Sequence, residues 1–458
     1  MNKLNQFDNS LLNRASSIEI GKSLRKTSPL EAHELIKPRP KGFSSNGILE
    51  KSNEDRLAEL IPIRYGRMLA SPFTFLRGSA ALMADDLSRT PNSGIYVQAC
   101  GDCHLLNFGA FATPERKLVF DINDFDETLP APWEWDIKRL ATSCVVAAQD
   151  NRLDDNTARL IAKVCVQSYR ENLRKYSKMS PLELWYKQLE LAKYAQNAPT
   201  KKTRLYREEL IKRAESRVAE YLFPKITTEI DGKKRLIDQP PLIFHQLKNN
   251  FEANAKQAIK DYRESLPDDR RILMDRYQLE DVVVKVVGIG SVGTRCFVAL
   301  LMTPDDEPLL LQVKEARPSV LEPYAGKSEY EKHGQRVVVG QRLTQSSSDI
   351  FLGWTRGPEG RDYYVRQLRD MKVSFSFDEV TPARLKQYAK YCGQALARSH
   401  AKSGNAAMIS GYLGKSDVFD EAVSHFSMEY AKKNQKDYNA LLDAVRKGTI
   451  KAISQTDS

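Results

Sequence analysis

Apolar side chains recur at helical or strand spacing along most of the chain, after a polar start. Residues 54–87 place them three and four positions apart, which predicts two helices. Two short apolar runs, 94–100 and 117–124, predict buried strands, and the pattern from 135 to about 260 is almost wholly helical. Residues 1–50 are polar and contain the breaker run KPRPKGFSSNG, so we expect a loosely attached arm there.

The pattern changes near residue 282. The stretch VVVKVVGIGSVGTRCFVALLM predicts two strands around a glycine turn, and LLLQVKEA predicts a third, so we expect a meander of three antiparallel strands. A helix over about 329–345, a hairpin in IFLGWTRGPEGRDYYVRQL and helices from Pro382 onward complete the chain. Segregated helices and antiparallel strands indicate an α+β fold.

Polar side chains gather where the two early strands end. Asp102, His104 and Asn107 lie in the loop GDCHLLNFG after the first strand, and Asp124 and Asp126 lie in NDFDE after the second. Phosphoryl transfer needs an Asp that accepts a hydroxyl proton, with an Asn and a further Asp that hold Mg²⁺. Magnesium prefers hard oxygen ligands, so these side chains are sufficient for such a site.

These two motifs resemble those of a known superfamily. GDCHLLNFG is similar to the H-G-D-x-H-x-x-N catalytic loop of aminoglycoside phosphotransferases and choline kinases, although Cys100 stands where those enzymes usually have His. NDFDE followed by WD is similar to their metal-binding strand end with its trailing structural Asp. The resemblance implies ATP and Mg²⁺ as cofactors. It places Asp102 and His104 in catalysis and assigns the metal to Asn107, Asp124 and Asp126. His104 is alternatively a hydrogen-bonding scaffold of its loop.

The chain also resembles, along nearly its whole length, a bacterial family known only as domain of unknown function 2252. The likeness lies in PFTFLRG, GDCHLLNFG, FDINDFDETLPAPWEWDIKRLA, VGIGSVGTR, QVKEA, GQRVVVGQR and DIFLGW. The family label supplies no reaction.

The glycine turn GIGSVG satisfies G-x-G-x-x-G, a pattern that several folds share. A dinucleotide-binding turn must open a helix, and a Walker loop needs Gly-Lys-[Ser/Thr], whereas here β-branched and apolar residues follow. The context favours a kinase nucleotide flap over a plain hairpin. Lys314 in QVKEA then resembles the lysine that holds the nucleotide phosphates. We assign nucleotide binding to Gly288, Gly290, Ser291, Gly293, Lys314 and Arg366, and a catalytic role to Lys314 as well.

A kinase helix should offer Lys314 a Glu partner. Glu329 and Glu331 lie near the start of the expected helix, while Val339 stands where the family often carries Glu, so the partner stays open.

The order of the motifs differs from that of an ordinary kinase, because Asp102 precedes Gly288 in the chain. Either one resemblance is coincidental or the fold is circularly permuted, which is tolerated where chain ends lie close together. We favour a permuted, protein kinase-like two-lobed fold, with a small antiparallel β lobe, a large helical lobe and a helical insertion. In one shared site, Lys314 should lie within roughly 10 Å of Asp124, whereas a separation above about 20 Å, or a helix opening at Gly293, would divide the motifs.

We expect five segments. They are a polar arm (1–50), a part with the catalytic loop and metal ligands (51–150), a mainly helical basic segment (151–275), a β domain with the glycine flap (276–375) and helices that complete the large lobe (376–458).

Charge and composition narrow the class of protein. The net charge is +11, and the stretch from Arg170 to Arg235 has 17 basic and 9 acidic residues, so +8 of it lies there. A solvated helical face accounts for this stretch, with a phosphate-rich partner such as nucleic acid as the less favoured alternative. No apolar run approaches the roughly 18 residues of a membrane span, and no signal-peptide pattern opens the chain, so we expect a cytoplasmic protein.

Cysteines raise three further alternatives. Cys100, Cys103 and His104 match C-x-x-C-H, but haem attachment requires export. A redox dithiol usually opens a helix, and zinc would need ligands beyond His104. Six scattered cysteines therefore indicate reduced thiols.

The sequence thus favours an ATP- and Mg²⁺-dependent phosphotransferase that acts on a hydroxyl of an unknown small molecule or protein. A nucleotide-binding pseudokinase scaffold and an AMP-transferring enzyme are the alternatives. The acceptor and the oligomeric state stay open.

Overall fold

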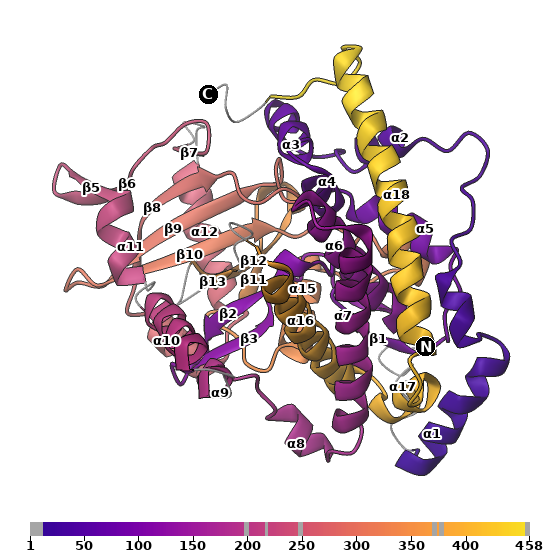
Figure 1. Cartoon of the computed structure of the whole chain (residues 1–458). Helices are drawn as coiled ribbons and strands as arrows, with labels where there is room; N and C mark the ends of the chain where they lie inside the picture. The colour runs from indigo at the N-terminus through magenta and orange to yellow at the C-terminus, as the bar shows by residue number, and fades with distance from the viewer. Residues whose placement is uncertain are drawn as a thin grey trace.

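The computed structural model describes residues 12–196, 201–215, 219–245, 251–368, 373–374 and 380–453. In this part of the chain, a six-stranded antiparallel sheet lies to one side of a group of long helices, and three smaller sheets accompany it (Figure 1). The predicted α+β class is confirmed.

The six-stranded sheet is built around the predicted meander. Its strand order is β11-β12-β10-β9-β8-β7, and all neighbours are antiparallel. The strands are β7 (Ile243–Phe244), β8 (Gln278–Lys285), β9 (Cys296–Met302), β10 (Pro308–Glu315), β11 (Gly353–Arg356) and β12 (Asp362–Gln367). Apolar and β-branched residues dominate β8, β9 and β10 because both faces of this sheet are covered.

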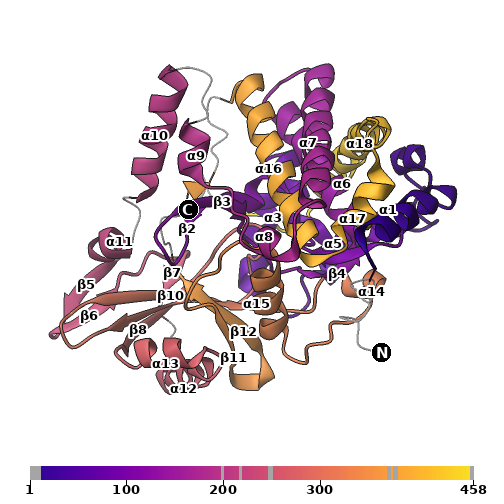
Figure 2. The same ribbon diagram turned by 90° about the horizontal axis from the view of Figure 1, so that it is seen from below.

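Helices cover the two faces of the sheet differently. On one face, α12 (Phe251–Arg263) and α13 (Asp268–Met274) pack through Tyr262 and Met274. Figure 2 shows these two helices beneath the sheet, and α15 (His333–Thr344) between the sheet and the long helices. The structure confirms the helix expected over about 329–345, but the helix begins at His333.

The helical part is held together by α6 (Trp133–Asp150), α7 (Asp155–Tyr176), α16 (Pro382–Ser403) and α18 (Val418–Arg446). The backbones of α7 and α16 approach closely at Gly393, where a Cβ would overlap a main-chain carbonyl oxygen of α7. The C-terminal helices expected from Pro382 onward are thus confirmed. None of the helices that the structure describes combines the length and the apolar character that crossing a bilayer requires.

The expectation of an almost wholly helical stretch from 135 to about 260 is wrong in its last part. Strands β5 (Thr227–Ile230) and β6 (Lys233–Leu236) form an antiparallel hairpin, and β7 joins the edge of the large sheet. Asp231 and Gly232 both have positive φ at the hairpin turn. Asp-Gly is a strong hairpin signal, so the sequence carries the reason for this correction.

The expectation of a loosely attached N-terminal arm is also wrong for its described residues. Helix α1 (Arg14–Ser23) packs on α17 (Ala406–Leu413), and a Cβ at Gly21 would overlap the Met408 carbonyl oxygen. Arg25 donates two hydrogen bonds to main-chain carbonyls of α17. The polar composition gives no sign of this attachment, because small residues and main-chain acceptors make the contacts.

Candidate active site

Two loops follow strands of two small sheets in the helical part. The Asp102 loop (residues 100–107) follows β1 (Tyr96–Ala99), and the Asp124 loop (residues 123–128) follows β3 (Leu118–Ile122). Strand β1 pairs with β4 (Leu129–Pro132), and β2 (Phe108–Ala112) pairs with β3. The main-chain N–H of Asn123 donates to the Asn107 carbonyl at 2.7 Å, which joins the two loops directly. Both early strands are therefore confirmed.

Helix α6 braces the Asp102 loop. The carboxylate of Asp136 accepts hydrogen bonds from the main-chain N–H groups of Cys100 at 2.7 Å and Gly101 at 3.0 Å. Gly101 has φ +82°, and a Cβ there would overlap the Glu127 carbonyl oxygen, so this position requires glycine. The loop is consequently held in one conformation by main-chain bonds and by close approach to the second loop.

Asp102 presents a partly exposed carboxylate, of which one oxygen is held from behind. Arg139 donates to Asp102 Oδ1 from Nε at 2.8 Å and also from Nη2. The Asp102 side chain is 21% exposed, and its Oδ2 lies 3.7 Å from His104 Nε2. Burial raises the pKa of Asp102, and Arg139 opposes that shift. Oδ2 therefore has the position and charge to accept a proton.

His104 is buried and close to two guanidinium groups. Burial lowers its pKa well below the ordinary value, and the charges of Arg77 and Arg139 lower it further. Among the described residues, its Nδ1 has no hydrogen-bond partner and its Nε2 lies 3.7 Å from Asp102 Oδ2, so the choice between a scaffold and a proton-transfer group stays open.

Oxygen atoms suited to a hard cation lie on both loops. Asn107 donates from Nδ2 to the Asp102 carbonyl at 2.5 Å, which leaves its amide oxygen for a ligand. Asp124 Oδ1 is buried, and no described residue hydrogen-bonds to it. Burial and the neighbouring Asp126 carboxylate raise the pKa of Asp124. An unbonded, buried carboxylate oxygen and an amide oxygen at the same cavity fit Mg²⁺, so Asn107 and Asp124 could hold that ion.

Lys314 reaches this place from the large sheet. It lies on β10, and its Nζ is 2.7 Å from Asp126 Oδ2 and 3.7 Å from Asp124 Oδ1. The expectation that Lys314 lies within roughly 10 Å of Asp124 is confirmed, although 188 residues separate Lys314 from Asp126. The two motifs therefore meet in space.

Asp126 is the close carboxylate partner of Lys314. Its Oδ1 accepts from the Tyr364 hydroxyl at 2.6 Å, and its Oδ2 accepts from Lys314 and from Ser291 Oγ. Burial opposes ionisation, but Lys314 and Tyr364 outweigh it and hold the pKa of Asp126 well below its usual range. Both oxygens thus accept hydrogen bonds from the protein. The role of Asp126 as a metal ligand stays a prediction.

Helix α15 contacts the Asp124 loop through Arg336. Arg336 donates to the main-chain carbonyls of Asp126, Thr128 and Arg317, which ties the Asp124 loop to the helix. Glu331 precedes the helix and pairs with Arg356 at 3.2 Å. The open question of the Lys314 partner is therefore answered by Asp126, which comes from the Asp124 loop.

The glycine loop (residues 286–295) connects β8 to β9, which are antiparallel neighbours. Gly288 and Gly293 have positive φ, of 66° and 86°. A strand follows Gly293, so the dinucleotide-binding and Walker interpretations, which both require a helix, are excluded.

One cavity of about 180 Å³ is lined by the two acidic loops and by the glycine loop of the large sheet. Side chains and main chain from the two loops and the glycine loop reach it, and so do four arginines, Arg56, Arg64, Arg77 and Arg317. The predicted residues at its wall are Asp102, His104, Asn107, Asp124, Asp126, Gly288, Gly290 and Ser291. Gly293, Lys314 and Arg366 lie behind the wall, where Arg366 donates from Nη1 to the Asn123 carbonyl at 3.0 Å.

Residues just before α3 (Ile61–Met68), together with that helix, hold the outside of the glycine loop. The main-chain N–H of Leu57 donates to the Gly293 carbonyl at 2.8 Å, and Arg67 donates to the Gly288 carbonyl at 2.6 Å. Arg56 donates to the Val292 carbonyl at 2.5 Å. Main-chain carbonyls of the glycine loop are therefore anchored by the N-terminal half of the chain.

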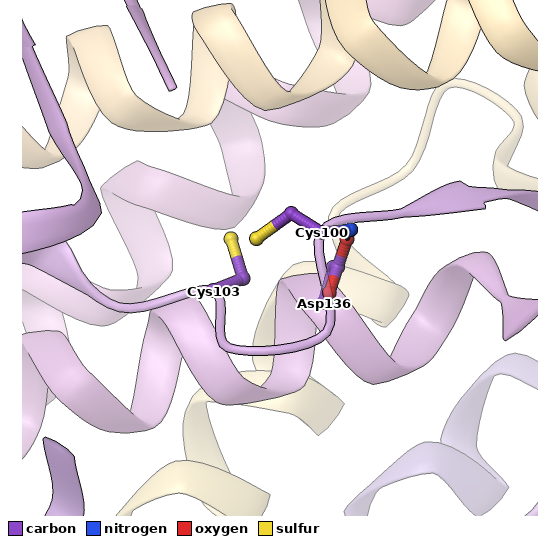
Figure 3. Close-up of side chains that lie close together, drawn as sticks. All are labelled: Cys100, Cys103 and Asp136. Atoms are coloured by element: carbon purple, nitrogen blue, oxygen red, sulfur yellow. Dashed lines mark hydrogen bonds between the residues drawn. The ribbon is translucent and has the colours of Figure 1, made fainter. Parts of the chain in front are cut away.

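The side chains of Cys100 and Cys103, both in the Asp102 loop, lie close to Asp136 of α6 (Figure 3). Their thiol sulfurs and a carboxylate oxygen lie within 4.8 Å of one another, so the third group beside the thiols is Asp136 and not His104. Burial raises the pKa of both thiols, and Asp136 already accepts from two main-chain N–H groups and lies 3.2 Å from His400 Nε2. All six cysteines are free thiols, as expected. In this arrangement Asp136 braces the loop.

Glu127 makes the stability of the folded protein depend on pH. Burial raises the pKa of Glu127 to about 7, and the Val320 N–H bond and Arg336 oppose the shift. The folded state therefore binds this proton more tightly than the unfolded state. Its contribution to stability is lost as pH rises from the ordinary pKa of about 4.5 through 7.

We expect Glu127→Gln to match the wild type near pH 4.5 and to exceed its free energy of unfolding by about 1–3 kcal/mol at pH 8. Glutamine is neutral at both pH values and can still accept the Val320 N–H. Urea titrations at the two pH values measure the difference, from which groups common to both proteins cancel. An equal difference at both pH values would contradict the assignment.

The fold and site define an α+β protein with a polar cavity, where two acidic loops meet a glycine loop and a buried lysine. The chain belongs to the family described as "Uncharacterized protein conserved in bacteria (DUF2252)", whose sequence model matches residues 56–444. No curated protein and no solved structure matches it.

Proposed function

We propose that this protein is an ATP- and Mg²⁺-dependent phosphotransferase with a circularly permuted, kinase-like fold. One observation carries the proposal: the glycine loop, Asp102, Asn107 and Asp124 line one cavity, and Lys314 lies directly behind its wall, 3.7 Å from Asp124. Phosphoryl transfer requires this set of groups around one phosphate chain.

The order of elements supports the kinase-like fold. The glycine loop, the Lys314 strand, helix α15 and the β11–β12 hairpin follow one another as in a kinase small lobe. Helix α16 contacts β1 and β3, from which the two acidic loops leave. In an unpermuted chain α16 would precede the Asp102 loop, as the long helix of phosphotransferases does.

Each side chain then has a defined task. Asp102 Oδ2 orients the acceptor hydroxyl and takes its proton, while Arg139 fixes the carboxylate from behind. Lys314 binds the upstream phosphates, and the glycine loop encloses them with main-chain groups. Asn107 and Asp124 hold Mg²⁺, which neutralises charge on the phosphates when it is bound.

Identification of the reaction product tests this function. The protein is incubated with Mg·ATP and a cell extract, the nucleotide products are separated, and the acceptor is sought by intact mass. Release of ADP that requires the protein supports phosphoryl transfer. Release of pyrophosphate would make the protein an AMP-transferring enzyme, and ATP binding without either product would make it a pseudokinase.

A further inference from the structure

Four arginines line the cavity, and three of them are engaged by the protein itself. Arg56 and Arg317 donate to main-chain carbonyls. Arg64 donates to Asn53 Oδ1 at 2.6 Å and to the Gly78 carbonyl at 2.8 Å. Arg77 differs: among the described residues it has neither a hydrogen-bond acceptor nor an ion-pair partner, and its buried Nε is unbonded.

The position of Arg77 is fixed by its backbone. It lies in the last turn of α4 (Pro72–Gly78), which begins with a capping box between Ser71 and Thr74. The carbonyls on either side of it, those of Leu76 and Gly78, accept from Arg139 and Arg64. The Arg77 carbonyl is the nearest atom to a Cβ built at Gly290, at 3.7 Å. The helix end thus lies between the Asp102 loop and the glycine loop.

The charge of Arg77 acts on both acidic loops without contacting either. Its guanidinium is attracted to Asp102 and Asp124, but neither carboxylate is within ion-pair distance. All three side chains line the same cavity. A largely buried cation without a partner is unfavourable. An anion that enters the cavity between Arg77 and the two acidic loops would remove that cost.

The side chains of Arg77, Asp102 and Asp124 together suit a phosphate group. A guanidinium fork binds two phosphate oxygens at once, and Mg²⁺ on Asp124 would bind others. The acceptor hydroxyl on Asp102 would face the phosphorus atom. Of the phosphates in the proposed nucleotide, the terminal one is the group that must lie among these three side chains.

We propose that Arg77 binds the γ-phosphate of ATP and stabilises the charge of the transferred phosphoryl group, an inference that rests on the proposed function. In this step the acceptor oxygen forms a bond to the γ-phosphorus, and the bond from that phosphorus to the bridging oxygen breaks. The electron pair of the broken bond leaves with ADP. The hydroxyl proton passes to Asp102. Arg77 keeps its proton throughout and exchanges only hydrogen bonds.

Nucleotide titrations of Arg77→Gln test the proposal. The ligands are Mg²⁺ with ADP, and Mg²⁺ with a non-hydrolysable ATP analogue that has nitrogen between its β- and γ-phosphates. We expect the affinity for the analogue to fall about 10- to 100-fold, the loss typical of a charge-assisted hydrogen bond, and that for ADP to change less than about twofold. Arg77→Lys keeps the charge without the fork and should fall between.

Arg64→Gln is the matched control, since Arg64 lines the same cavity but bonds to the protein. It should lower Tm and weaken both nucleotides alike, whereas Arg77→Gln should leave Tm nearly unchanged. Equal effects of Arg77→Gln on ADP and on the analogue, or no effect on either, would overturn the role of Arg77. If the wild type bound neither nucleotide, the proposed function itself would fail, and this role with it.

Discussion

Replacing Asp102 by asparagine is expected to lower the rate of phosphoryl transfer by about 10² or more, the scale on which removal of a general base acts. Asparagine keeps the size of the side chain but cannot take a proton from the acceptor. Its amide oxygen can still accept from Arg139, and Arg139 keeps its bond to the Leu76 carbonyl, so the loop should stay folded. The measurement is ADP release with acceptor-containing extract, alongside nucleotide affinity, which should change only a few-fold.

Asp305→Asn serves as the control, because Asp305 is exposed in the turn between β9 and β10. This variant also removes one negative charge, but at a position distant in sequence from the acidic loops. It should leave the rate unchanged. Turnover of Asp102→Asn within a few-fold of the wild type would show that Asp102 is not the proton acceptor.

The second large effect concerns stability. Asp121 and Arg398 form a fully buried ion pair at 2.9 Å, which joins β3 to α16. Asp121 also accepts from the N–H and hydroxyl of Ser346, and Arg398 donates to the Thr344 carbonyl. We expect Asp121→Ala to lower the free energy of unfolding by about 3–5 kcal/mol, because it leaves a buried guanidinium without a counter-charge. Urea denaturation measures this loss.

Two variants separate the charge effect from lost packing. Asp121→Ala combined with Arg398→Leu removes both charges and should be more stable than Asp121→Ala alone. Glu429→Ala breaks an exposed pair with Lys432 and should cost less than about 1 kcal/mol. Arg398→Leu alone completes the comparison: a double variant that loses as much free energy of unfolding as Asp121→Ala and Arg398→Leu together would mean that the pair has no electrostatic coupling.

The local sequence predicts the strands around the site because each polar motif follows a short apolar run. Strands β1, β3, β8, β9 and β10 all arise in this way. The proximity of Lys314 to Asp124 could be predicted only through the resemblance to phosphotransferases, since no periodicity in the sequence relates the two residues. The resemblance also led to the metal-ligand prediction for Asp126, whose contact with Lys314 depends on tertiary packing.

Tertiary packing, which no local pattern encodes, positions other parts of the site. Arg56, Arg64 and Arg317 resemble ordinary surface cations in sequence, and only the fold turns them toward main-chain acceptors in the cavity wall. The Asp231-Gly232 turn, by contrast, was a readable signal for β5 and β6. Composition alone misjudged the N-terminal arm, because polar residues can be attached through small side chains and main-chain bonds.

Calorimetry with ATP, with and without Mg²⁺, tests most directly whether the glycine loop, Lys314 and the acidic loops form one nucleotide site. We expect the wild type to bind ATP and to bind it more tightly with Mg²⁺, and Lys314→Ala to lose at least about tenfold in affinity, as the loss of a charged partner for phosphate implies. No heat of binding for the wild type, or undiminished affinity in Lys314→Ala, would contradict the account.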